Sequence, residues 1–177
     1  TANKENDPFR LIAKELKRIT QASFTSISLY NPEEKVLTVQ QVCGDNQLIE
    51  SITDRANNKR TGYKAPLGHQ TCHQLKEELI VELPDLYSAL SGALTRGDAE
   101  FIQKTSKMER FISLALTVGK ELIGTSLIIL PEHHPTPSEK VLKVFAGVAA
   151  ASIKQRQAEK ALKESENKFR IITESSA

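Results

Sequence analysis

The sequence predicts a single α+β domain in which helices lie beside an antiparallel sheet. Three observations lead to this prediction. The 177 residues provide enough chain for one domain with a real core. Two pairs of β-rich runs are each joined by a short turn, which is the pattern of antiparallel hairpins. Amphipathic helical runs precede and follow them. Hairpins framed by helices indicate an antiparallel sheet with helices packed against it.

Composition and charge exclude several classes of function. Hydrophobic residues make up 39% of the chain and charged residues 26%, as in an ordinary soluble domain. The net charge of +2 gives no reason to expect nucleic acid as a partner. The longest apolar run, residues 111–130, is interrupted by Gly119-Lys120-Glu121, so no membrane span is predicted. With only two cysteines and no signal-peptide core, we expect a cytoplasmic protein or the cytoplasmic part of a longer one.

The first elements are a helix and a hairpin. Residues 8–22 are predicted to form a helix, because Asp7 is a good N-cap, Pro8 fits the first turn and apolar residues recur every three or four positions. The alternating runs at residues 24–30 and 36–42 are predicted to form two strands joined by a turn rich in Asn and Pro.

The middle of the chain is predicted to consist of short elements. Pro66 assigns its strand to a sheet edge, because proline cannot donate to a ladder. Residues 99–107 show no clear pattern. The predicted elements are a short helix near residues 48–52, a loop at 57–62, an edge strand at 63–68, a helix at 69–79, a strand at 80–83 and a short helix at 85–94.

The last third contains the strongest hairpin and a long helix. Residues 110–118 and 121–130 are predicted to form the hairpin, and Ser138 is predicted to cap the helix that follows. From residue 154 onward this helix becomes polar and contains no Gly or Pro, while Leu162 and Phe169 lie seven residues apart. That spacing favours a coiled-coil linker that pairs two copies of the chain. The alternative is a single helix that extends into solvent and frays. The residues expected to face the core are Val141, Val144, Phe145, Val148 and Ala151.

Two stretches carry a resemblance to known families. The hairpin at residues 110–130, with Glu-Leu-Ile-Gly after its turn, and the helix at residues 141–153 resemble the end of a GAF domain. Residues 158–176 resemble the linker helix and opening turn of a PAS domain. The resemblance divides the chain into a GAF-like domain at residues 8–153, a linker helix at 154–170 and the start of a PAS domain at 171–177.

The resemblance implies a GAF-like central antiparallel sheet of about six strands, flanked by N- and C-terminal helices, with a small-molecule pocket on one sheet face. It also implies homodimerisation through the terminal helices, and downstream PAS and kinase domains in the same chain. The catalytic domains of such a sensor histidine kinase would lie outside these residues. The residues expected to line the pocket are Tyr63, Cys72, Leu75, Leu86, Tyr87 and Leu90. The alternative is that they form the ordinary core of a domain that binds nothing.

His69, Cys72 and His73 form the most distinctive local cluster. On a helix, positions i, i+3 and i+4 share one face, and imidazole and thiolate are good ligands for haem iron or another metal. The alternative is that Cys72 packs as a small hydrophobic residue and the histidines lie at the surface. Cys72-His73 also resembles the pair to which bilins attach in phytochrome-type GAF domains, but the Asp-Ile-Pro-type motif of those domains is absent.

No sequence motif supports catalysis by this segment. A phosphate-binding glycine loop and a nucleophile elbow are both absent, and the paired carboxylates fall on predicted solvated faces. A GAF-fold methionine sulfoxide reductase would need more cysteines than Cys43 and Cys72. We therefore expect a sensory module for an unidentified small molecule. The alternatives are a ligand-free dimerisation module and a haem- or metal-binding redox sensor that uses Cys72 and His73.

Overall fold

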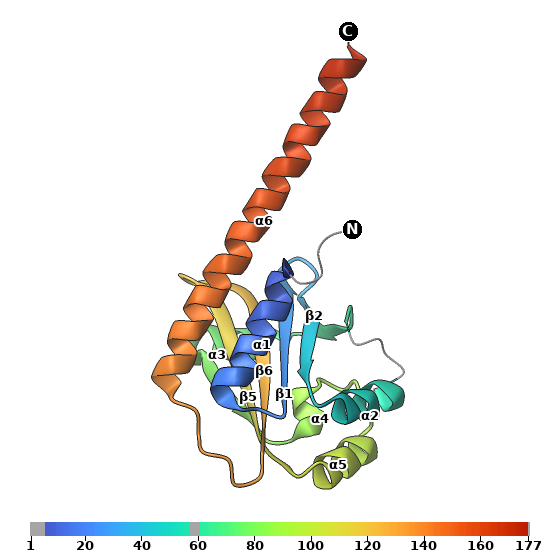
Figure 1. Cartoon of the computed structure of the whole chain (residues 1–177), viewed down its shortest axis with the longest axis vertical. Helices are drawn as coiled ribbons and strands as arrows, with labels where there is room; N and C mark the ends of the chain where they lie inside the picture. The colour runs from blue at the N-terminus through green and yellow to red at the C-terminus, as the bar shows by residue number, and fades with distance from the viewer. Residues whose placement is uncertain (1–5, 57–60, 177) are drawn as a thin grey trace.

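The computed structural model describes residues 6–56 and 61–176. They form an α+β fold around one six-stranded antiparallel sheet, as expected from the sequence (Figure 1). The strand order is β3-β2-β1-β6-β5-β4. The strands are β1 (Phe24–Asn31), β2 (Val36–Gly44), β3 (Lys64–Pro66), β4 (Ile80–Leu83), β5 (Met108–Val118) and β6 (Glu121–Pro131).

The helices cover both faces of this sheet. Helices α1 and α6 pack on one face, over a core cluster that includes Ile27, Leu114 and Ile128. Helices α2, α4 and α5 pack on the other face around Phe111 and Ile129. The helices are α1 (Pro8–Thr20), α2 (Asn46–Ala56), α3 (His69–Glu78), α4 (Leu86–Ala89), α5 (Arg96–Thr105) and α6 (Glu139–Ser175).

Local sequence signals explain most of these boundaries. The Asp7 side chain accepts a hydrogen bond from the backbone N–H of Phe9 and starts α1. Asn31 caps the turn between β1 and β2 by accepting from the backbone of Glu33 and Glu34. The predicted edge strand is β3, at the end of the sheet. The predictions of α1, both hairpins, α3 and β4 are thus confirmed.

Two parts of the middle region differ from what the sequence predicts. Residues 96–105, largely unassigned from sequence, form helix α5, in which Thr95 caps the N-terminus and Ala99 and Ile102 are buried. The predicted helix at residues 85–94 is reduced to the single turn of α4, which is followed by a turn through Ser91 and Gly92, both with positive φ. Most of the loop predicted at residues 57–62 lies outside the described residues.

One glycine fixes how closely β1 and β6 approach. A Cβ atom at Gly124 would lie 2.1 Å from the backbone oxygen of Ser28, a separation that no side chain tolerates. The strands pair in antiparallel register through Leu29 opposite Gly124 and Ser28 opposite Thr125. Gly124 therefore sets the position of the β1 backbone at the centre of the sheet.

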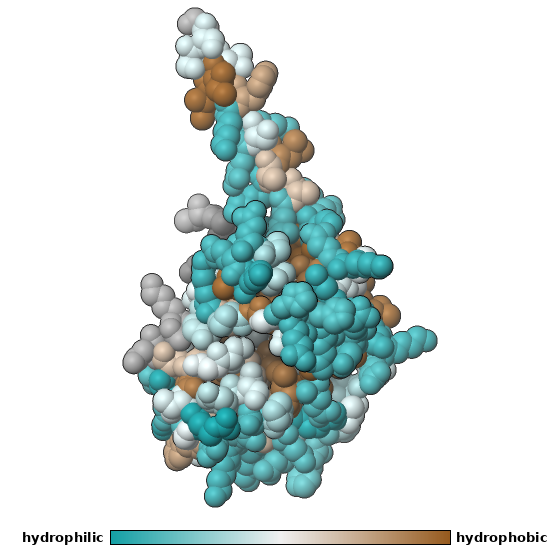
Figure 2. Space-filling view, turned by 180° about the vertical axis from the view of Figure 1, so that it is seen from behind, coloured by the Kyte–Doolittle hydropathy of each residue, from teal (hydrophilic) through white to brown (hydrophobic). Residues whose placement is uncertain are grey.

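Helix α6 runs unbroken from Glu139 to Ser175, and its C-terminal part projects away from the domain (Figure 1). Every residue from Lys154 to Ser176 is exposed, and Figure 2 shows hydrophobic side chains near the tip of this projection. Among the described residues, no helix combines the length and apolar composition needed to cross a bilayer.

The prediction of which face of α6 is buried was wrong. Val144 and Val148 are 63% and 67% exposed, Val141 and Ala151 are also exposed, and only Phe145 packs in part against the core. The first turns of this helix are apolar on two sides, so its sequence offers two possible stripes. The structure buries the stripe rich in alanine, whose small side chains let the helix approach the sheet closely. The buried residues are Leu142, Ala146, Ala149, Ala150 and Ile153.

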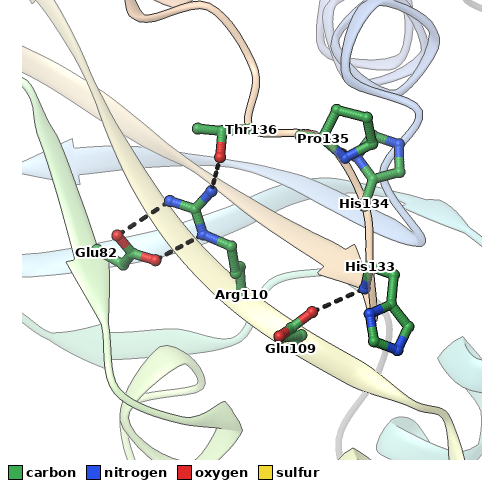
Figure 3. Close-up of polar contacts among 7 residues, drawn as sticks. All are labelled: Glu82, Glu109, Arg110, His133, His134, Pro135 and Thr136. Atoms are coloured by element: carbon green, nitrogen blue, oxygen red, sulfur yellow. Dashed lines mark hydrogen bonds and ion pairs between the residues drawn. The ribbon is translucent and has the colours of Figure 1, made fainter.

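The loop between β6 and α6 is tied to β5 by polar contacts (Figure 3). Arg110 makes a bidentate ion pair with Glu82 on β4, at 2.8 and 3.1 Å, and also donates to the hydroxyl of Thr136 in the loop. The Glu109 carboxylate accepts from the backbone N–H of His133, at 2.8 Å. The hydrogen bonds from Arg110 lower the pKa of Glu82. These contacts fix the start of α6 relative to the sheet.

Candidate binding site

A cavity of about 190 Å³ lies on the sheet face opposite α1 and α6. Its floor is formed by side chains from β1, β2, β4, β5 and β6, and its walls by α2, α3, β3, α4 and the turn after α4. Strands β1 and β6 contribute alternate residues, because side chains on a strand point to the two faces in turn. Within β1, Ser26 and Ser28 face the cavity, while Ile27 packs in the core under α1 and α6.

The centre of the floor is polar. Ser28 pairs directly with Thr125 across β1 and β6, and the next row contains Ser26, Leu127 and Ser113 on three adjacent strands. The exposed fractions of Ser26, Ser28 and Thr125 are 7%, 7% and 6%. Hydroxyl groups are thus concentrated where a sheet floor normally carries branched apolar side chains.

The walls are mostly apolar and come from short helices. Ile49 and Ile52 of α2 and Leu75 of α3 contribute aliphatic surface. Helix α4 is held at its N-terminus by Asp85, whose carboxylate accepts from the backbone N–H of Ser88 at 2.7 Å. This backbone hydrogen bond lowers the pKa of Asp85.

Three of the six residues expected to line a pocket lie on the cavity wall, namely Tyr63, Leu75 and Leu90. The others lie elsewhere. Leu86 is fully buried in the core cluster under α5, and the ring of Tyr87 lies 4.5 Å from the Arg96 guanidinium. Cys72 packs into a core cluster with Leu67, Val81, Ala115 and Leu122. Helical periodicity identified these residues as inward-facing but could not tell cavity from packed core.

His69, Cys72 and His73 do not converge on a common point. Cys72 is buried, whereas His69 and His73 are exposed on α3. Among the described residues, no group of three His, Cys, Asp or Glu side chains is placed to hold a metal ion. The Cys72 thiol lies against Tyr30, where burial first, and the hydrogen bond with Cys72 second, raise the pKa of the phenol. The metal or haem role of this cluster stays a prediction from sequence.

The cavity residues that the sequence analysis missed include the hydroxyl residues of the floor. Their signal was present in the sequence: Ser26 and Ser28 alternate with apolar residues in a strand that was predicted correctly. From sequence alone, a serine that alternates with apolar residues is expected to lie on the exposed face of a half-buried strand. Only the tertiary structure shows that both faces of β1 are covered.

Comparison with solved structures places this arrangement among known folds. The second GAF domain of DevS from Mycobacterium smegmatis superposes with a TM-score of 0.56 and 15% identity, over 88% of this chain and 99% of that one. The GAF domain/HD domain protein from Geobacter sulfurreducens superposes with a TM-score of 0.57 and 10% identity, over 89% of this chain and 97% of that one. The chain has the fold of a GAF domain. No protein-family model matches the sequence, and no curated protein matches it either.

A third similar structure is the chromophore-binding domain of the bacteriophytochrome RpBphP3 from R. palustris, with a TM-score of 0.59 and 13% identity. The match covers 86% of this chain, which spans 56% of that domain. In the GAF fold of the present chain, the cavity lies between the central sheet and α2, α3 and α4, and the long helix α6 leaves from the opposite face.

Proposed function

We propose that this GAF domain is the sensory module of a signal-transduction protein: it binds a small molecule in the sheet cavity and passes its state to a neighbouring domain through α6. The cavity is the observation that carries this proposal. A module that serves only to dimerise needs no cavity, and close packing of the same sheet face would stabilise it more. The 190 Å³ beside Ser28 and Leu75 therefore favours ligand binding over the ligand-free alternative.

The sheet provides physical contact between the cavity and α6. On β5, Ser113 faces the cavity, while its neighbours Ile112 and Leu114 pack in the cluster that contains α1 and α6. A ligand that moves β5 by a fraction of an ångström must also change the packing under α6, because cores are dense and repack between discrete arrangements. The ligand acts by binding one of two arrangements of α6 more tightly than the other.

The exposed face of α6 carries a continuous heptad seam, which we define as the ten positions at alternating spacings of three and four. All ten are exposed in the structure. Sustained a/d spacing of this kind is the signature of a coiled coil. The seam consists of Val141, Val144, Val148, Ala151, Gln155, Ala158, Leu162, Ser165, Phe169 and Ile172.

The occupant proposed for this seam is the same helix of a second copy of the chain. An unpartnered helix with an apolar stripe of this length is marginal in water, whereas two parallel copies bury both stripes. The seam starts at Val141, on the part of α6 that packs on the sheet, and continues past Leu162 and Phe169. Because it spans both parts, a change at the domain reaches the far end of the helix without an intervening joint.

The neighbouring domain is proposed to be a PAS domain, beginning near residue 171, and the output a histidine kinase in the cytoplasm. The resemblance of residues 158–176 to a PAS linker supports this order of domains. The division into a domain at 8–153 and a linker at 154–170 is part of the same proposal. The catalytic step of such a protein is assigned to domains outside this segment.

The proposed relay from the cavity to α6 can be tested by filling part of the cavity with a larger side chain in place of a ligand. Ala89→Leu adds a larger side chain on α4 at the cavity wall, and Gln70→Leu adds a leucine on the exposed face of α3. Amide hydrogen exchange along α6 is measured in both variants. The proposal expects altered exchange in α6 for Ala89→Leu and exchange unchanged from wild type for Gln70→Leu. Identical α6 exchange in the two variants, both folded, would contradict the proposed relay.

A further inference from the structure

The described lining of the cavity carries no charged side chain. Among the described residues that line it, none is Asp, Glu, Lys, Arg or His. An ionised carboxylate or phosphate in such a site loses its hydration without gaining a countercharge, which makes binding unfavourable. The lining that the structure describes therefore disfavours anionic ligands, including nucleotides and tetrapyrroles that carry propionate groups.

The cavity does offer unpaired hydroxyl groups. The hydroxyls of Ser26, Ser28 and Thr125 have no hydrogen-bond partner among the described residues, although each side chain is more than nine-tenths buried. None of the three hydroxyl oxygens is fully enclosed by protein atoms. Within the described part of the chain, only Nε2 of His134 is both fully enclosed and without a hydrogen-bond partner. The three hydroxyls thus face the cavity, where they are available to form hydrogen bonds with a bound molecule.

The volume limits the size of the ligand. A cavity of roughly 150 Å³ in a protein core holds one benzene ring, and pockets for drug-sized ligands measure roughly 300–1,000 Å³. At about 190 Å³, this cavity falls just above the lower of these sizes. It therefore fits a molecule of one ring, or a compact aliphatic molecule of similar size.

We infer that the cavity of this chain takes a small, uncharged, mainly apolar molecule that carries a single hydrogen-bonding group, of the phenol, small ketone or small amide class. The ring or alkyl part contacts Ile49, Ile52 and Leu75, and the polar group bonds to the hydroxyls of Ser28 and Thr125. This inference rests on the proposed function, since it names the ligand class of the same cavity. It predicts that a one-ring molecule with a hydroxyl group binds more tightly than one of the same size without it.

The test uses three probes with one ring each: phenol, toluene and benzoate. Binding to the full 177-residue chain is followed by two-dimensional NMR. The variant Thr125→Val removes one floor hydroxyl. The matched control is Thr38→Val, because Thr38 lies on β2 and does not line the cavity. Phenol is expected to bind about five- to tenfold more tightly than toluene, the worth of one hydrogen bond. Thr125→Val should remove most of that difference, Thr38→Val should keep it, and benzoate should bind more weakly than either neutral probe.

Two results would overturn the inference in different ways. If benzoate binds more tightly than phenol and shifts the resonances of cavity residues, the ligand class is wrong but a sensory cavity stands. If no probe, charged or neutral, shifts cavity resonances, and Ala89→Leu leaves α6 unchanged, the sensory function fails together with its ligand. Equal phenol affinity in Thr125→Val, Thr38→Val and wild type would contradict the role of the floor hydroxyls.

Discussion

Ser28 and Thr125 stand directly opposite each other on β1 and β6, with both hydroxyls on the sheet face that lines the cavity. One residue further along β6, Gly124 lets the backbone of Ser28 approach so closely that any side chain there would collide with it. The polar floor of the cavity thus depends on a backbone contact at the centre of the sheet. This contact links the stability of the fold to the geometry of the binding site.

Replacing Gly124 should therefore destabilise the fold. Gly124→Ala places a Cβ atom 2.1 Å from the Ser28 oxygen, so the strands must separate. We expect a loss of about 1–3 kcal/mol, the usual cost of overpacking a core, measured as a lower urea midpoint. Gly147→Ala is the control, because its Cβ meets nothing within 4 Å and alanine favours a helix. Equal midpoints for Gly124→Ala and wild type would show that the contact carries no strain.

Thr25 on β1 and Thr125 on β6, which lie on opposite faces of the sheet, should respond differently to the loss of their hydroxyls. The hydroxyl of Thr25 donates to the carbonyl of Ala13 at 2.9 Å and is fully buried, so Thr25→Val should cost about 1 kcal/mol or more. Thr125 makes no such bond within the described residues, so Thr125→Val should leave the free energy of unfolding unchanged or raise it. Chemical denaturation of both variants measures the difference. A loss at Thr125 as large as that at Thr25 would mean that the Thr125 hydroxyl is already satisfied.

A charge in the seam of α6 should weaken self-association. Leu162→Asp and Val148→Asp each place a carboxylate where two helices are proposed to meet, and Lys143→Asp places the same group on exposed surface outside the seam. We expect the dimer dissociation constant to rise at least tenfold in the first two variants and little in the third. Sedimentation equilibrium provides the measurement. Unchanged sedimentation of Leu162→Asp would count against the paired helix.

The cap of α4 should make stability fall in acid. The pKa of Asp85 is lowered in the folded state, chiefly by the backbone hydrogen bond from Ser88. Its contribution is therefore fully present above the carboxyl's unfolded pKa, about 3.9, and is lost as the pH falls through the lower folded value. Asp85→Asn keeps a cap without a titrating group, so its stability should decline less steeply below about pH 4.

Thermal unfolding across this pH range tests the effect, with Asp54→Asn on the exposed side of α2 as the control for loss of one carboxylate. Asp85→Asn should be less stable than Asp54→Asn above about pH 4, and this gap should close as the pH falls, because the contribution of ionised Asp85 is then lost in Asp54→Asn as well. Parallel curves for both would assign the acid sensitivity to other carboxylates, such as Glu82, whose pKa is lowered by its hydrogen bonds with Arg110.

Local signals in the sequence determined the type and order of most elements. Asp7, Asn31 and Ser138 act through hydrogen bonds to backbone only two or three residues away, so their effect is visible without a fold. The two hairpins follow from alternation and short turns for the same reason. The unbroken polar run after residue 154 likewise predicted a continuous helix, because nothing in it interrupts the backbone ladder.

Only the tertiary structure decided which faces are covered and by what. In α6 the sequence offers two apolar stripes, and the choice of the alanine stripe over Val144 and Val148 depends on how closely a helix fits the sheet. In β1 the same holds for Ser26 and Ser28, which form a cavity floor only because α2, α3 and α4 close over them. Burial depends on contacts between segments that are distant in the sequence. The periodicity of a single sequence predicts the face on which a side chain lies, but not which other segment, if any, covers that face.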